Sequence, residues 1–196
     1  MRGQAQIYSY LLVALIIITL IGTVYTWGLP LIRKRQDTGV VERVRSFFDP
    51  NNPTSLERRI VFVASNKGEE YFSLDKEGIW ILDTTENSIS FTFFSRVSNF
   101  GVGEWISLSG EDCENIREGS LGERPFVVCA RSDPVADGFN ITYKIVFRDL
   151  VDEDGNTYRI ILSGTSSAVS KKGIIRYVKT STSQKLIETK IEILLG

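Results

Sequence analysis

The two cysteines are the residues whose spacing most clearly allows a chemical bond. Cys113 and Cys129 are separated by 15 residues, and the chain contains no histidine. This spacing matches neither a zinc ribbon nor a CxxC redox pair, and no imidazole is present to complete a metal site. We therefore predict a disulfide, which would contribute about 3 kcal/mol by restricting the unfolded chain. Two buried free thiols are the alternative.

A group of acidic residues next to Gly155 raises the question of a calcium site. The group consists of Asp149, Asp152, Glu153 and Asp154. Its spacing does not match the D-x-[DN]-x-[DN]-G loop with a glutamate at position twelve. Because Asp154 and Gly155 lie between apolar runs at 141–147 and 158–162, we interpret them as a hairpin turn. We predict no metal and no cofactor.

The residue types also argue against catalysis and against nucleic-acid binding. The absence of histidine removes the commonest general base and the usual nucleophile pairs, and the acidic residues are dispersed over turns. With 23 basic and 24 acidic residues, the net charge of -1 leaves no excess of positive charge to attract nucleic acid. We predict that the chain is not an enzyme. The single methionine and the many Glu, Lys and Arg residues are typical of thermophiles.

One tripeptide could accept a glycan. Asn140-Ile141-Thr142 is the only N-glycosylation sequon in the chain, and such tripeptides also arise by chance. Asn140 is therefore a candidate modification site, and it matters only if the domain that carries it is extracellular.

The longest uncharged segment runs from Ile7 to Ile32 and has 26 residues, where roughly 20 suffice for a helix to cross a bilayer. Aromatic residues lie near both ends, as expected of interfacial belts: Tyr8, Tyr10, Tyr25 and Trp27. A cleaved signal peptide would have a shorter apolar run and a small-x-small cleavage site, and a buried core helix is a further alternative. We predict a transmembrane helix with these membrane and assembly positions: Ile7, Leu11, Leu15, Ile18, Gly22, Trp27 and Pro30.

The helix is predicted to extend beyond the membrane as an amphipathic segment over residues 33–48. One face of this segment is apolar, because its hydrophobic residues follow helical spacing: Val40, Val41, Val44, Phe47 and Phe48. Gly22 and the nearby Pro30 weaken the helical ladder, so we expect a kink near Trp27. The two prolines in 49–53 then end the helix, and residues 49–57 form a linker.

Residues 58–196 are predicted to form a β-rich domain. Short β-branched and aromatic runs alternate with turn residues there, at 58–64, 79–82, 89–93, 105–108, 126–128, 141–147, 158–162, 174–178 and 186–195. About nine or ten strands without an intervening helix favour a mainly antiparallel β-sandwich. The predicted fold is α+β, with one long N-terminal transmembrane helix followed by that sandwich.

The sequence begins Met1-Arg2-Gly3-Gln4, with a basic residue and a glycine directly before a polar position and the long apolar helix. This arrangement resembles the leader of archaeal type IV pilin-like proteins, over about the first 35 residues. The resemblance implies that a prepilin peptidase-like enzyme cuts between Gly3 and Gln4, so that residues 1–3 are a leader and the mature helix covers 4–48. Tyr8 stands where bacterial pilins carry a glutamate, which many archaeal members also lack.

The charges on the two sides of the span bear on its orientation. Arg2 and the amino terminus are the positive groups before it, whereas five basic residues follow it: Arg33, Lys34, Arg35, Arg43 and Arg45. The positive-inside rule alone places the C-terminal domain in the cytoplasm. The predicted disulfide and the leader favour an extracellular domain instead, which is our expectation. The basic cluster would then contact anionic head groups or a neighbouring subunit.

Two functions of different classes follow. The first is a structural subunit of an extracellular type IV pilus-like filament, used in adhesion or motility, whose partners are the membrane, copies of itself and the processing peptidase. The alternative is a membrane-anchored, non-polymerising β-sandwich that acts as a binding module, similar to the archaellum stator subunits.

Overall fold

The structure is a computed structural model, and it describes the backbone of residues 2–196 and the side chains of residues 8–196. The chain divides into two compact units, the first ending at Gly39 and the second beginning at Val40. Three helical segments follow one another across this boundary: α1 (Arg2–Thr23), the π-helical segment η1 (Val24–Gly28) and α2 (Leu29–Phe47). The second unit therefore includes the last turns of α2.

Ten strands of the second unit form one sheet, with the order β3-β5-β6-β2-β1-β9-β10-β8-β7-β4. The strands are β1 (Glu69–Asp83), β2 (Ser88–Ser95), β3 (Ile106–Ser107), β4 (Gly119–Ser120), β5 (Phe126–Val135), β6 (Gly138–Phe147), β7 (Leu150–Val151), β8 (Thr157–Gly164), β9 (Ser167–Ser183) and β10 (Leu186–Leu195). Two pairs are parallel, β10 with β8 and β4 with β7, and the other named pairs are antiparallel. The predicted α+β class with a mainly antiparallel sheet is confirmed.

The C-terminal end of α2 packs into the core of this sheet. Phe48 follows α2 directly and is fully buried, as are Val41 and Val44 on the same helix face. The ring of Phe48 stacks on Tyr143 of β6 at a centroid distance of 4.7 Å, and it lies 6.1 Å from the ring of Trp80 in β1. The apolar face predicted for the end of the helix is therefore confirmed, because it supplies the centre of an aromatic cluster.

A second helix, α3 (Leu56–Asn66), replaces the strand predicted at 58–64. Leu56, Ile60 and Val63 are buried at helical spacing, whereas Phe62 is 60% exposed. The run from Ile60 to Val63 is continuously apolar, so its composition suits a strand and a helix equally. The predicted linker is also shorter than expected, since α3 already includes residues 56 and 57.

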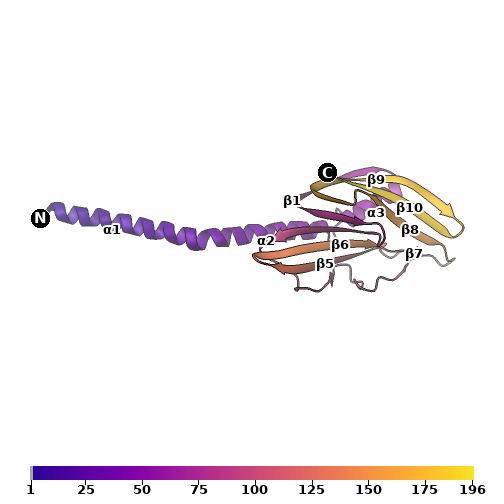
Figure 1. Ribbon diagram of the computed structural model, residues 1–196, viewed down its shortest axis with the longest axis horizontal. Helices are drawn as coiled ribbons and strands as arrows, with labels where there is room; N and C mark the ends of the chain where they lie inside the picture. Colours follow the sequence, from indigo (N-terminus) through magenta and orange to yellow (C-terminus); the bar gives the residue numbers. More distant parts are fainter. Residues whose placement is uncertain (1) are drawn as a thin grey trace. The chain divides into compact units, whose positions relative to one another are not determined.

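The strands predicted as a mainly antiparallel β-sandwich are joined by hydrogen bonds into one sheet of ten named strands. Figure 1 shows β5 and β6 on one side of this unit and β9 and β10 on the other. The inner face of the sheet packs against α3 and the end of α2, which share its core. These helices bury apolar surface that a second, independent sheet would otherwise have to cover.

Candidate functional site: an apolar helix and a cross-linked loop

The N-terminal helix exposes apolar side chains around its whole circumference. From Tyr8 to Trp27, every side chain is exposed in the isolated chain. The predicted positions Leu11, Leu15 and Ile18 are among them. A helix that is hydrophobic all round is stable only when lipid or other helices surround it. Among the described residues, one helix is long and apolar enough to cross a membrane, although a signal sequence would meet the same criteria.

The threonine hydroxyls within this helix are satisfied internally. The hydroxyl of Thr19 donates to the carbonyl oxygen of Leu15 at 2.8 Å, and that of Thr23 donates to the carbonyl oxygen of Thr19 at 2.9 Å. Thr26 repeats the pattern with Gly22 at 2.9 Å. Hydroxyls bonded to their own helix avoid the cost of an unpaired donor in hydrocarbon. The threonines are therefore compatible with an apolar environment.

The helix changes its winding at the place where a kink was expected. Residues Val24–Gly28 form a π-helical turn, and the N–H of Leu29 donates to the carbonyl oxygen of Val24. Pro30 follows immediately and has no N–H to contribute to the ladder. Widening the preceding turn is a common way to accommodate such an interruption. The turn includes Trp27, one of the aromatic residues of the predicted belt.

The dimensions of the apolar segment fit a bilayer. The 26 residues from Ile7 to Ile32 span about 39 Å as a helix. This exceeds a hydrocarbon thickness of about 30 Å and approaches the 40–45 Å of a whole bilayer. Arg33, Lys34 and Arg35 follow and are exposed. In a helix that crosses a bilayer, these positions would correspond to the depth of the head groups.

The predicted processing site falls in the first turn of α1, which begins at Arg2. The side chains of Gly3, Gln4 and Ile7 lie outside the residues whose side chains are described. Cleavage after Gly3 therefore stays a prediction.

In the second unit, Cys113 and Cys129 form the predicted disulfide, with Cα atoms 6.0 Å apart. Cys129 lies in β5 opposite Lys144 of β6, on the outer face of the sheet. Val127 and Val146 occupy the same face and are buried although they are not part of the main core. The bond thus fastens the loop 108–125 over this part of the sheet.

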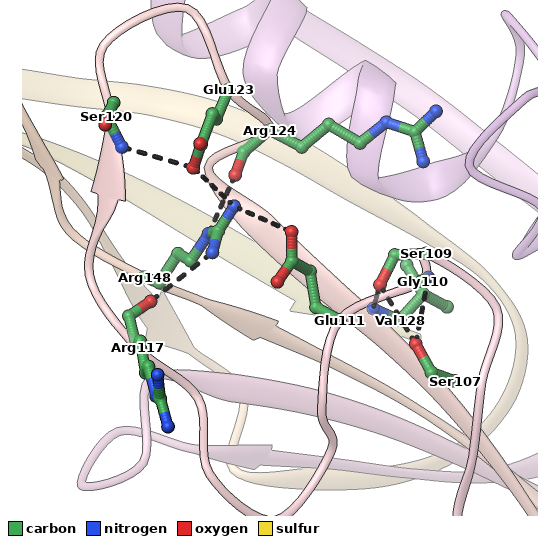
Figure 2. A network of polar contacts seen from close by, with 10 residues as sticks. All are labelled: Ser107, Ser109, Gly110, Glu111, Arg117, Ser120, Glu123, Arg124, Val128 and Arg148. Carbon is green, nitrogen blue, oxygen red and sulfur yellow. Dashed lines mark hydrogen bonds and ion pairs between the residues drawn. The ribbon is translucent and has the colours of Figure 1, made fainter.

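Arg148 holds the same loop by a second set of contacts, shown in Figure 2. Its side chain is only 6% exposed. The guanidinium donates to the carbonyl oxygen of Arg124 at 3.0 Å and to that of Arg117 at 3.4 Å. It also pairs with Glu123 at 3.2 Å and Glu111 at 3.5 Å. A buried guanidinium with several acceptors fixes a loop more firmly than exposed ion pairs do.

The candidate glycosylation residue Asn140 is half-buried in β6, between Phe94 of β2 and Asp133 of β5. The hydroxyl of Thr142, in the same sequon, shares a 2.9 Å hydrogen bond with Thr92. The acceptor thus lies within a regular strand of the sheet, and its modification stays a prediction.

Within the acidic turn, Asp152 organises the backbone. The side chain of Asp152 accepts hydrogen bonds from the side chain and backbone of Asn156 and from the backbone N–H of Asp154. These hydrogen bonds lower the pKa of Asp152, and the bond from the Asn156 side chain has the largest effect. The turn joins β7 to β8, and not β6 to β8 as the apolar runs suggested. Within the described part of the chain, no group of three metal-ligating side chains is present.

Sequence reasoning also missed the ionisable residue Glu57 in the first turn of α3. Its side chain is fully buried, and neither carboxyl oxygen has a hydrogen-bond partner. Burial raises its pKa to about 7, against the smaller lowering effects of the Ser55 hydroxyl, the backbone of Glu57 and the charge of Arg58. The sequence carried a signal, since Ser55 and an acidic residue two positions later are typical of a helix start. Nothing in the sequence indicated that the carboxyl would face the core.

In comparisons with known proteins, no family model, curated protein or solved structure matches this chain.

Proposed function

We propose that this chain is a structural subunit of an extracellular type IV pilus-like filament, used in adhesion or motility, that assembles through its N-terminal helix. One observation carries the proposal: the side chains from Tyr8 to Trp27 form an apolar surface on all sides of a helix. Such a surface requires lipid before assembly and neighbouring helices afterwards. The proposed role is therefore structural and needs no catalytic group.

The way in which the helix joins the β-rich unit supports this role. The last turns of α2 and Phe48 are buried in the core of that unit. A force on the helix is therefore transmitted to packed aromatic rings in the sheet, and not to a loose linker.

The disulfide supports an extracellular position for the β-rich unit, because such bonds persist mainly in oxidising compartments. The exposed Arg33, Lys34 and Arg35 argue for the opposite orientation by the positive-inside rule. In an assembled filament these side chains would contact acidic groups of neighbouring subunits or of the membrane surface. We therefore propose an extracellular unit anchored by a single span.

Shearing native cells and imaging the released material by immunogold electron microscopy tests the proposal. We expect filaments that carry this chain along their length. Substitution of Leu15→Arg, in the middle of the apolar helix, should abolish them, since a charge there is costly in lipid and between packed helices. The matched control Phe62→Ala, on the exposed face of α3, should leave them unchanged. If the protein occurs solely in membranes and never in filaments, the anchored binding module similar to archaellum stator subunits is favoured instead.

A further inference from the structure

A groove of about 700 Å³ lies in the second unit, between α3 and the segment that enters β5. We call it the α3 groove and define it by Pro53, Arg58, Phe62, Arg124, Pro125 and Phe126. Phe126 is buried beneath the groove. Phe62 lies at the side of the groove and is more than half exposed. The groove thus combines an apolar surface with guanidinium groups, at a volume suited to a ligand.

The two arginines that define the α3 groove donate hydrogen bonds to neutral acceptors, although Arg58 also lies near enough to Glu57 to lower the pKa of that carboxyl. Nε of Arg58 donates to the carbonyl oxygen of Pro50 at 3.1 Å, and Nη2 of Arg124 donates to Oδ1 of Asn51 at 3.1 Å. Figure 2 shows the guanidinium of Arg124 pointing away from the Arg148 network, although its carbonyl oxygen belongs to it. Among the described residues, no carboxylate forms an ion pair with either arginine.

The carboxylates that line the groove are already neutralised. Glu70 pairs with Arg59 at 3.1 Å, and Glu123 pairs with Arg148 at 3.2 Å. Glu123 additionally accepts the backbone N–H of Ser120 at 3.1 Å. The lining therefore keeps an excess of positive charge from Arg58 and Arg124, which a ligand can complement.

The composition of the groove favours a protein partner. Its lining contains three arginines, two phenylalanines and no lysine. Aromatic residues and arginine are enriched in protein–protein interfaces, whereas lysine is depleted. Arginine also binds carboxylates in a bidentate geometry, which lysine cannot do.

We propose that the α3 groove binds a polypeptide segment of a partner protein in which apolar side chains alternate with carboxylates. The apolar side chains of the segment contact Phe62 and the prolines of the groove, Pro53 and Pro125. Its carboxylates pair with Arg58 and Arg124. This binding is independent of filament formation, since it uses residues of the second unit alone.

Calorimetric titration of the full chain in detergent micelles tests the proposal with two synthetic peptides. One is acetyl-Glu-Phe-Glu-Phe-Glu-amide, and the other replaces each glutamate by glutamine. We expect the acidic peptide to bind about tenfold more tightly, and this preference to weaken as salt is added. Arg124→Gln should remove most of the preference for the acidic peptide, and Arg58→Gln should do the same. Phe62→Ala should weaken the binding of both peptides.

Two controls make the result specific to the groove. Lys171→Gln removes an exposed positive charge on β9, outside the groove, and should leave binding unchanged. Thermal unfolding of each variant shows whether it is folded, and Arg124→Gln keeps the contact of Arg58 with Pro50 intact. Absence of binding, equal affinity for the two peptides, or undiminished affinity in the folded Arg124→Gln variant would overturn the proposal. Binding that occurs only to vesicles of acidic phospholipid would overturn it as well.

Discussion

At the scale of single residues, Glu57 couples the stability of the second unit to pH. The carboxyl is fully buried without a hydrogen-bond partner, and its pKa is raised from 4.5 to about 7. The folded state therefore holds this proton more tightly than the unfolded state does. The stabilisation from the protonated Glu57 is fully present below pH 4.5 and is lost as the pH rises through 7. The complete loss amounts to about 3 kcal/mol of unfolding free energy.

Substitution of Glu57→Gln should remove this dependence, because glutamine has a similar shape and does not ionise. We expect the unfolding free energies of the two proteins to be similar near pH 4.5, with the variant more stable by about 2 to 3 kcal/mol at pH 8. Denaturant unfolding followed by tryptophan fluorescence measures this difference. Glu77→Gln, at an exposed position on β1, is the control and should show the wild-type profile. Parallel profiles for wild type and Glu57→Gln would contradict the assignment.

Phe48 is the residue that joins the helix to the sheet. It stacks on Tyr143 at 4.7 Å and on Phe91 at 6.1 Å. Phe48→Ala should lower the unfolding free energy of the second unit by about 3 to 5 kcal/mol, because it opens a cavity in a closely packed cluster. The exposed Phe62→Ala should change it by no more than about 0.5 kcal/mol. Similar losses for the two variants would show that Phe48 is not central to the core.

At the scale of elements, the sequence predicted where several strands lie but only part of the length of β1, β5 and β9, and it missed α3. The last run, 186–195, matches β10 at both ends, although its apolar and polar residues alternate imperfectly. The run at 58–64 is apolar at consecutive positions and carries no period, so tertiary contacts decide its conformation. Strand pairing is also set by contacts distant in sequence, which is why the strand order of the sheet could not be read from the sequence.

The loop 108–125 is the element whose attachment could be predicted only in part. The spacing of Cys113 and Cys129 indicated the disulfide, whereas the role of Arg148 depends on carbonyl oxygens brought near it by folding. Sequence alone does not indicate which arginine will be buried among such acceptors.

Removing the disulfide should destabilise the second unit without changing its fold. The double variant Cys113→Ala, Cys129→Ala should lose about 3 kcal/mol of unfolding free energy, because the unfolded chain is no longer cross-linked. Arg148 should still hold the loop in the native state. Denaturant unfolding with and without a reducing agent checks this, since reductant should weaken the wild type and leave the double variant unaffected. If reductant weakened both proteins equally, the disulfide would not be the bond on which the reductant acts.

At the scale of the whole molecule, processing at the start of the helix distinguishes a filament subunit from a membrane anchor. The apolar surface of α1 and η1 is present in the structure, whereas the residues proposed for processing, Gly3 and Gln4, lie outside the described side chains. A protein that keeps its leader would remain a membrane anchor, and a protein cut after Gly3 would be ready to assemble. The two functions considered for this chain therefore differ at its N-terminus.

The most direct test of the filament account is the mass of the N-terminal peptide of the protein isolated from its native cells. We predict that this peptide begins at Gln4, so that residues 1–3 are missing, and that Gly3→Val prevents the cut. Gly68→Val, at a glycine far from the leader, is the control and should be processed normally. A native N-terminal peptide that still begins at Met1 would contradict the account.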